Sequence, residues 1–179
     1  MKFFDWLTVT KRPAAGVPPK SVAEVRADLL AINRPTAPFI VRDGAPENVD
    51  LVAEWRIVDA KWYEIFAKAG LRKGFKVLMK LNEQESEVRP IDERRSIEWR
   101  AGLPNLSWET SGPTLSWETE VSRGQNKEYS YGRAFAFTER GPFGEIYHYK
   151  FVSGEIKTPL QDAVTKAGWV WRGVAFGKL

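Results

Sequence analysis

The sequence contains no cysteine and only one histidine, His148. The absence of cysteine excludes disulfide bonds, thiolate nucleophiles and zinc sites built on thiolates. With a single histidine, a site built on several imidazole groups is excluded as well. The sequence also lacks a Gly-x-x-x-x-Gly-Lys phosphate loop, a Gly-x-Gly-x-x-Gly turn and a Gly-x-Ser-x-Gly nucleophile elbow. We therefore assign no catalytic residue, no metal site and no cofactor.

Long hydrophobic runs are missing too. No segment approaches the roughly 18 consecutive apolar residues of a membrane span. Near the N-terminus, Asp5 interrupts a short apolar patch, and Lys11-Arg12-Pro13 follows before any site that resembles a signal-peptide cleavage site. These features predict a cytoplasmic protein without a signal peptide.

The 179 residues fit one domain, and 8 Trp, 10 Phe and 5 Tyr provide the side chains for a well-filled core. Lys and Arg number 27 against 23 Asp and Glu, and the two signs are interspersed along the chain. Arg94, Arg95 and Arg100 lie close to Glu83, Glu87 and other acidic residues, so no basic stripe is formed. A nucleic-acid partner is therefore not expected.

The first 20 residues differ in character from the rest. Residues 8–20 contain three prolines and a glycine without periodicity, which favours an extended tether. We expect residues 1–20 to be an arm and tether, and residues 21–179 to form a single α+β domain. Within the arm, Phe3, Trp6 and Leu7 share one helical face and positive charge accompanies them, which suggests a weak membrane or partner contact. The alternative is that residues 1–12 fold back onto the domain.

Three helices are predicted from capping and periodicity. Ser21 and Glu24 form a capping box at the start of the first helix, which stops at Asn33-Arg34-Pro35. Asp59 can cap a second helix that ends at Gly70. Thr158-Pro159 opens the third helix with a cap and a proline at the first helical position.

Alternation of large apolar and other side chains predicts roughly eight strands. They lie near residues 39–41, 51–58, 75–81, 87–91, 95–100, 129–138, 145–152 and 169–176. The strands follow one another in sequential runs, which indicates an α+β fold with one large, curved antiparallel sheet. An open sheet and a closed barrel both agree with this pattern.

Residues 106–119 contain a repeat of Leu-Ser-Trp-Glu-Thr. If the four residues between the copies form a hairpin loop, Trp108 lies opposite Trp117, and Glu109 and Glu118 share the other face. A duplicated surface loop is the alternative. Paired carboxylates can support glycoside hydrolysis, but a solvated polar face explains these two glutamates more simply.

The predicted strand at 129–138 has one face of large side chains and one of small ones. A five-residue loop at 139–143 would align Phe135 with Tyr147 on the large face. The small face would then form the floor of a groove beside His148 and Lys150, which could donate hydrogen bonds to an anionic or polar ligand. The candidate ligand-binding residues are Ser130, Gly132, Ala134, His148 and Lys150. A helix packed on the small face is the competing interpretation.

The segments 50–66 and 157–169 resemble members of a family of small, uncharacterised bacterial proteins. This resemblance implies a cytoplasmic bacterial origin, and it brings neither an activity nor assigned catalytic residues. We therefore predict a non-catalytic binding or interaction module whose partner is an unknown protein or small ligand. The alternative is an enzyme that uses His148 or a carboxylate in the sheet groove.

Overall fold

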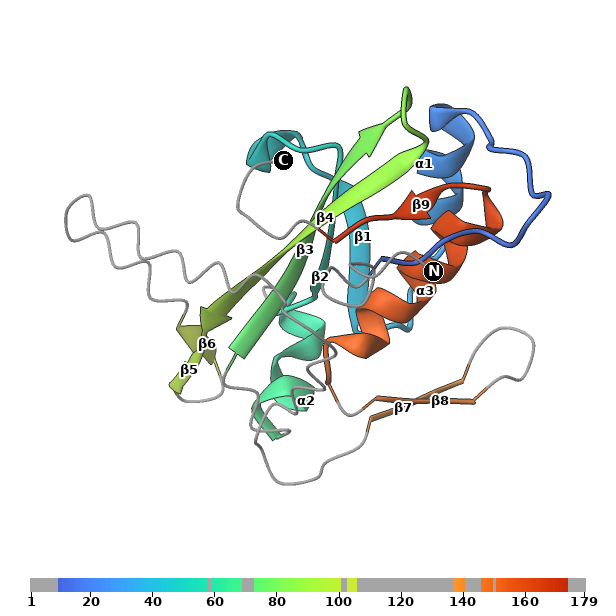
Figure 1. Ribbon diagram of the computed structural model, residues 1–179. Helices are drawn as coiled ribbons and strands as arrows, with labels where there is room; N and C mark the ends of the chain where they lie inside the picture. The colour runs from blue at the N-terminus through green and yellow to red at the C-terminus, as the bar shows by residue number, and fades with distance from the viewer. Residues whose placement is uncertain are drawn as a thin grey trace.

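The computed structural model describes residues 10–57, 59–68, 73–100, 103–105, 137–140, 146–149 and 151–173. These residues form an α+β fold in which three α-helices accompany a five-stranded, mostly antiparallel sheet (Figure 1). The helices are α1 (Val22–Leu30), α2 (Tyr63–Lys68) and α3 (Gly154–Lys166). Two short 3-10 helices are η1 (Ala45–Glu47) and η2 (Ala60–Trp62). The expected α+β class is confirmed.

The sheet has the strand order β1-β2-β3-β4-β9. Its strands are β1 (Phe39–Asp43), β2 (Leu51–Trp55), β3 (Lys73–Asn82), β4 (Glu87–Ser96) and β9 (Val170–Trp171). The sheet is open, with β1 and β9 at its two edges, so the barrel alternative is not observed. The first four strands pair antiparallel, whereas β9 is parallel to β4. The expectation of a purely antiparallel sheet was wrong at this edge, because local alternation carries no information about the direction of a distant partner strand.

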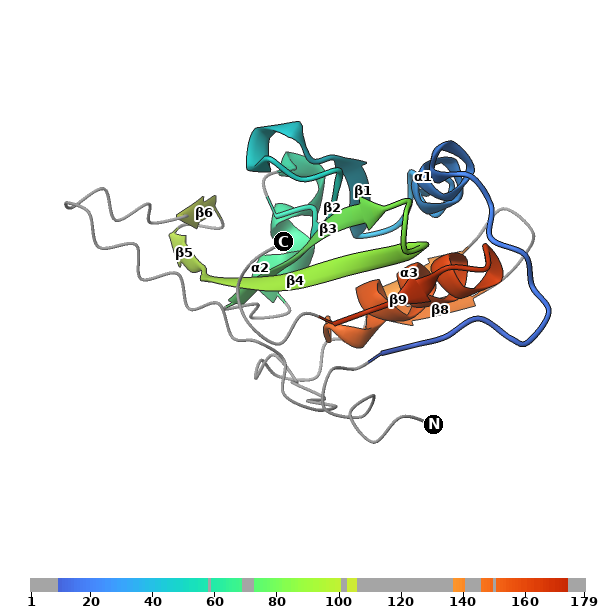
Figure 2. The same ribbon diagram turned by 45° about the horizontal axis from the view of Figure 1, so that its top comes forward.

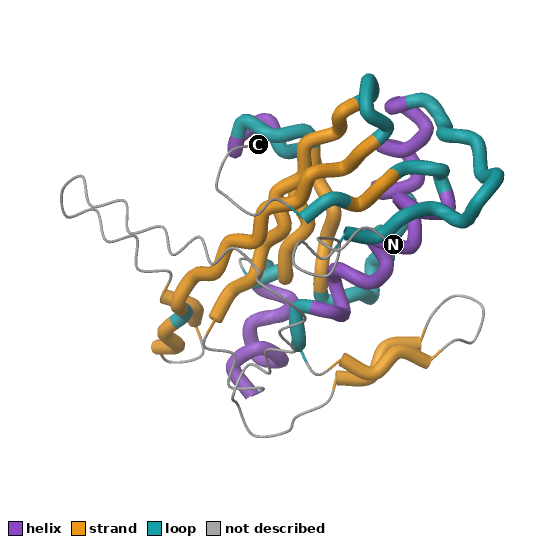
Figure 3. The backbone as a smooth tube through the Cα atoms, viewed as in Figure 1, coloured by secondary structure: helices purple, strands orange, loops and turns teal. Residues whose placement is uncertain are grey.

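The predicted eight-stranded sheet is also wrong, because the other strands form separate hairpins. They are β5 (Glu98–Arg100) with β6 (Leu103–Asn105), and β7 (Phe137–Arg140) with β8 (Ile146–Tyr149). Figure 3 shows both hairpins outside the main sheet. The repeat at 106–119 lies outside the described residues.

Strand β4 runs without interruption through Pro90, where two separate strands were expected. The Val88 carbonyl accepts a hydrogen bond from the Arg172 backbone N–H and so faces β9. Backbone direction alternates along a strand, so Pro90 faces the same way as Val88. The N–H that proline lacks is therefore not needed by β3, and the strand continues.

The start of α1 is confirmed in detail. The Ser21 hydroxyl accepts from the Glu24 backbone N–H, and the Glu24 carboxylate accepts from the Ser21 backbone N–H at 2.9 Å. Asp59 likewise caps the next helical segment, where its carboxylate accepts from the Lys61 backbone N–H.

The predicted start of α3 at Thr158-Pro159 was wrong. The helix begins at Gly154, and Pro159 lies inside it. The earlier start places Ile156 on the buried stripe with Leu160 and Val164, all three fully buried. Burial of a side chain of that size contributes roughly 1.5–3 kcal/mol, which offsets most of the roughly 3 kcal/mol that a proline inside a helix costs.

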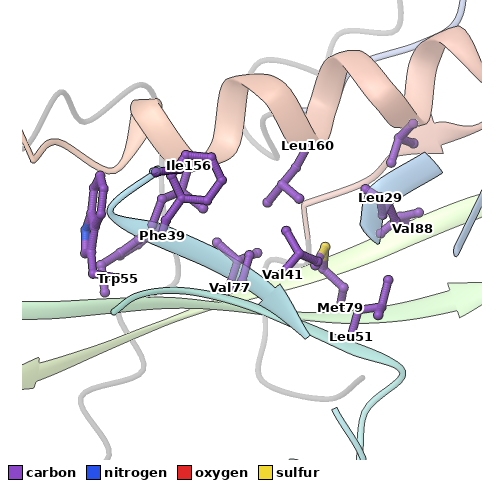
Figure 4. Close-up of a cluster of buried hydrophobic side chains, with 14 of the residues drawn as sticks. Leu29, Phe39, Val41, Leu51, Trp55, Val77, Met79, Val88, Ile156 and Leu160 are labelled. Atoms are coloured by element: carbon purple, nitrogen blue, oxygen red, sulfur yellow. The ribbon is translucent and has the colours of Figure 1, made fainter. Parts of the chain in front are cut away.

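One hydrophobic core lies between the helices and one face of the sheet. Ile156 and Leu160 point from α3 toward Phe39 and Val41 of β1 (Figure 4). Helices α1 and α2 add Leu29 and Phe66 to the same core. We call this side of the sheet the inner face.

Residues 10–20, called the strap here, run alongside β9 to the start of α1 (Figure 2). Lys11 and Trp171 exchange two backbone hydrogen bonds of 2.8 and 2.9 Å. At the other end, the Lys20 N–H donates to the Ala167 carbonyl at 2.9 Å, and the Trp169 indole N–H donates to the Lys20 carbonyl at 2.8 Å. Gly168 has a φ of +76°, and a Cβ there would lie 2.4 Å from the Pro18 carbonyl oxygen, so glycine is required. Both ends of the strap are therefore fixed to the fold.

The register predicted for the β7–β8 hairpin was wrong by four residues. Phe137 lies opposite Tyr149, and Arg140 lies opposite Ile146. The strands continue to Arg140 and resume at Ile146, so the connection falls two residues later than expected. An even shift leaves the assignment of residues to faces unchanged.

Candidate interaction face

Only one of the candidate ligand-binding residues falls within the described part of the chain. His148 lies in β8, opposite Thr138 of β7, and is exposed. Lys150, Ser130, Gly132 and Ala134 lie outside the described residues, as do Phe3, Trp6 and Leu7 of the arm. The predicted groove and the predicted arm contact therefore stay predictions.

The residue after His148 lies on the opposite side of the hairpin and anchors it. Tyr149 is 4% exposed, and its ring makes edge contacts with Phe39 and Trp55 at centroid distances of 6.3 and 6.4 Å. Its hydroxyl accepts a hydrogen bond of 2.6 Å from Arg34, whose guanidinium also lies 5.8 Å from the Phe39 ring centroid. This alternation agrees with rings facing inward and His148 facing outward.

The other face of the five-stranded sheet carries a different set of side chains. Alternation along the strands directs them away from the core that α1, α2 and α3 cover. We call this side the open face, and we define it by Ile40, Arg42, Val52, Glu54, Lys76, Leu78 and Ile91. Among the described residues, η1 lies next to the open face. It supplies the side chain of Glu47, and Val49 follows shortly after it in the chain.

Four charged side chains of this region form a closed network, the quartet, made of Arg42, Glu47, Glu54 and Lys76. Arg42 donates to Glu47 at 2.5 and 3.0 Å and to Glu54 at 2.6 Å. The Lys76 ammonium lies 3.0 Å from Glu47 and 3.3 Å from Glu54. Each cation therefore contacts both carboxylates, and each carboxylate contacts both cations.

Sheet register explains why the quartet forms. Glu54 lies directly opposite Lys76 on β3, so the two strands bring these opposite charges together. Arg42 lies on the neighbouring strand β1, two positions beyond the residue that is opposite Glu54. Its long side chain therefore reaches Glu54 diagonally. Glu47 comes from the 3-10 turn between β1 and β2.

The contacts of the quartet favour the charged forms of Glu47 and Arg42. The hydrogen bonds from Arg42, followed by that from Lys76, lower the pKa of Glu47 to about 2, although partial burial opposes the shift. The same contacts, first of all the one with Glu47, raise the pKa of Arg42. Glu47 thus stays ionised at neutral pH, which suits a fixed surface charge and not a general acid.

A small apolar cluster lies beside the quartet. It consists of Val49, Val52 and Leu78, with Ile91 packed against it. Val52 is fully buried although it points away from the main core. The open face is therefore a packed surface in which the charged side chains are held in place around apolar neighbours.

Two buried carboxylates, Asp92 and Glu87, form three further ion pairs. The carboxylate of Asp92 binds Lys157 of α3, and its side chain is 7% exposed. The carboxylate of Glu87, with a side chain 3% exposed, binds both Arg89 and Arg172. Removing one partner from such a pair leaves a buried charge, so these contacts tie α3 and the chain after β9 to β4.

Sequence reasoning missed the quartet as a unit. In the sequence, Glu54 alternates with Ala53 and Trp55, and Lys76 alternates with Phe75 and Val77, so alternation alone puts both charges on the side away from the core, in agreement with the structure. It could not pair them, because pairing depends on the β2–β3 register, and no pattern marked Glu47 as their partner. Opposite charges at outward-facing positions of two neighbouring strands are the signal that could have suggested the contact between Glu54 and Lys76.

Within the described ranges, no group of three or more His, Cys, Asp or Glu side chains is arranged to hold a metal ion. No helix in this part of the chain has the length and hydropathy needed to cross a membrane. Comparison with known proteins gives no match to a family model, a curated protein or a solved structure. The resemblance to small bacterial proteins therefore stays a prediction.

Proposed function

We propose that this chain is a non-catalytic interaction module of a cytoplasmic bacterial protein, and that the open face contacts a protein partner. The observation that carries the proposal is the closed quartet on that face. Its four side chains are held by one another, with side-chain exposures of 15–29%. They are reachable from outside and ordered before a partner arrives.

Pre-ordered charges favour specific association for two reasons. Fixing a long, flexible side chain at an interface costs about 0.5–1.5 kcal/mol, and the quartet has already restricted its members in the unbound protein. A fixed pattern of charge also selects among partners, because juxtaposed like charges are repelled. Outside the quartet, Lys80 lies opposite Arg89, Arg89 is paired with Glu87, and Glu93 lies opposite Lys76, so both signs of charge are present on this side of the sheet. We therefore expect the partner to present a surface with a complementary pattern of positive and negative charges.

Site-specific crosslinking tests the proposal. A photo-reactive residue replaces Ile40 on the open face, and in a matched control it replaces Ala27 on α1, which is exposed. Both full-length variants are produced in cells of the source organism and illuminated. The expected result is one adduct at position 40 and none at position 27, followed by titration of the purified partner with the unmodified chain.

The result that overturns the proposal is the same adduct pattern at both positions, or no adduct at position 40. A partner that binds a chain with Glu54→Lys as tightly as the unmodified chain would also contradict it. Any of these three results would mean that the quartet has a role in folding and not in binding.

A further inference from the structure

Strand β1 forms one edge of the five-stranded sheet, and within the described residues it pairs with a strand on one side only (Figure 1). The Pro38 carbonyl accepts a hydrogen bond from the Arg56 backbone N–H, so the even-numbered residues of β1 direct their backbone groups toward β2. Phe39, Val41 and Asp43 therefore direct theirs away from β2. We call this side of the strand the outer edge.

The side chain of Asn33 takes the place of a neighbouring strand at the centre of the outer edge. Its Nδ2 donates to the Val41 carbonyl, and its Oδ1 accepts from the Val41 backbone N–H, both at 2.7 Å. Two such bonds are what a residue in an antiparallel ladder exchanges with the residue opposite it. Asn33 belongs to the connection between α1 and β1, which brings it beside the strand. Both backbone groups of Val41 are thus satisfied without another strand.

The outward carbonyls on either side of Val41 are covered by side chains as well. The Arg56 Nε donates to the Phe39 carbonyl at 3.2 Å, and the Arg42 guanidinium donates to the Asp43 carbonyl at 3.0 Å. All three carbonyls that point outward from β1 therefore accept hydrogen bonds from side chains of the same chain. At the opposite edge of the sheet, the strap closes β9 through the bridge described above.

The composition of β1 explains what this cover prevents. The strand begins with Phe39-Ile40-Val41, three large apolar residues that favour strands. An edge strand of this kind is a template for pairing with a strand of another molecule. If two β1 strands paired antiparallel about Val41, they would use the same N–H and carbonyl that Asn33 now occupies.

We propose that Asn33 is an autoinhibitory contact that closes the outer edge of β1 against pairing with a second copy of this chain. The outer edge and the open face are different surfaces. Either proposal can therefore fail without the other.

The test compares Asn33→Ala with the matched control Asn82→Ala in the full-length chain. Asn82 accepts a hydrogen bond of 3.2 Å from the Glu85 backbone N–H in the turn after β3, so its substitution removes a side-chain hydrogen bond away from β1. A fluorescent peptide with the sequence of residues 38–44 is titrated with each chain. We expect Asn33→Ala to bind the peptide at least about tenfold more tightly than the unmodified chain, and Asn82→Ala to match the unmodified chain.

Sedimentation velocity and hydrogen exchange provide a reading that a purely structural role of Asn33 would not change. The dimer fraction should rise with concentration more steeply in Asn33→Ala than in the other two chains. The Val41 amide should exchange faster in dilute Asn33→Ala than in the unmodified chain, and it should regain protection when the dimer or the peptide complex forms.

Asn33→Ser provides a second variant, because its polar side chain is too short to reach both backbone groups of Val41. It should bind the peptide as Asn33→Ala does. The proposal is overturned if folded Asn33→Ala or Asn33→Ser binds the peptide no better than Asn82→Ala, or if all chains associate equally. Loss of folding in both Asn33 variants would assign this residue a role in folding alone and would also overturn it.

Discussion

The inner and open faces of the sheet are built from the same strands, yet they are stabilised in different ways. On the inner face, apolar side chains such as Val41 and Val77 are covered by helices. On the open face, the charged residues that alternate with these apolar residues along the strands form ion pairs beside a small apolar cluster. Burial of apolar surface does not depend on pH, whereas ion pairs depend on pH and are screened by salt. The two faces can therefore be distinguished by experiment.

The largest effect is expected on the inner face. Leu160→Ala should lower the free energy of unfolding by about 2–5 kcal/mol, because Leu160 is fully buried and the smaller side chain leaves a cavity. Asp162→Ala, at an exposed position of the same helix, is the control and should change it by less than about 0.5 kcal/mol. Urea denaturation followed by circular dichroism measures both values. Equal losses would show that α3 does not pack on the sheet as described.

A smaller effect is expected on the open face. Glu47→Gln should lower the free energy of unfolding at neutral pH by roughly 1–2 kcal/mol, because the amide removes the negative charge that Arg42 and Lys76 share. Glu83→Gln, at an exposed position of the β3–β4 turn, is the control with the same chemical change. The contrast fails if both variants unfold at the same urea concentration.

The stabilisation from Glu47 should also depend on pH. The pKa of Glu47 is about 2 in the folded chain and near 4.5 in the unfolded one, so ionised Glu47 favours the folded state. The difference in stability between the unmodified chain and Glu47→Gln should therefore be constant above about pH 4.5, decline as the pH falls, and be lost near pH 2. Denaturation series at several pH values test this, and a difference that persists unchanged at pH 2 would exclude the quartet as its source.

The smallest effect is expected at His148. Because its side chain is exposed while Tyr149 is buried, His148→Ala should change the free energy of unfolding by less than about 0.5 kcal/mol. Tyr149→Ala in the same strand provides the comparison and should destabilise the chain strongly. A large loss in His148→Ala would mean that the outward assignment of this residue is wrong.

Local features of the fold could be predicted from the sequence because they depend on neighbours in the chain. The capping box at Ser21 and the cap at Asp59 need only residues two or three positions away. Alternation in β2 and β3 identified which side chains face the core. These are effects of backbone geometry and side-chain period, which are local.

The errors arose where distant contacts decide the structure. The strong local signal Thr158-Pro159 was overridden because an earlier helix start buries Ile156 against residues of the sheet. The parallel pairing of β9 with β4 depends on the position and direction of the chain after α3 ends. The candidate site follows the same rule, since Glu54 and Lys76 were placed on outward faces but their contact with Glu47 required the folded β1–β2 connection. The bridge between Lys11 and Trp171 joins the two ends of the chain and has no local signal at all.

The claim that the open face is a preformed binding surface, separate from the folding core, is tested most directly by reversing the quartet. Arg42→Glu, Glu47→Arg, Glu54→Lys and Lys76→Glu are combined in one full-length chain, together with the photo-reactive residue at position 40. Glu93→Lys is added because Glu93 lies opposite Lys76. Opposite charges still meet in this variant, so we predict a melting temperature within a few degrees of that of the unmodified chain and complete loss of the crosslinked adduct. An adduct of unchanged yield, or a variant that no longer folds, would contradict the account.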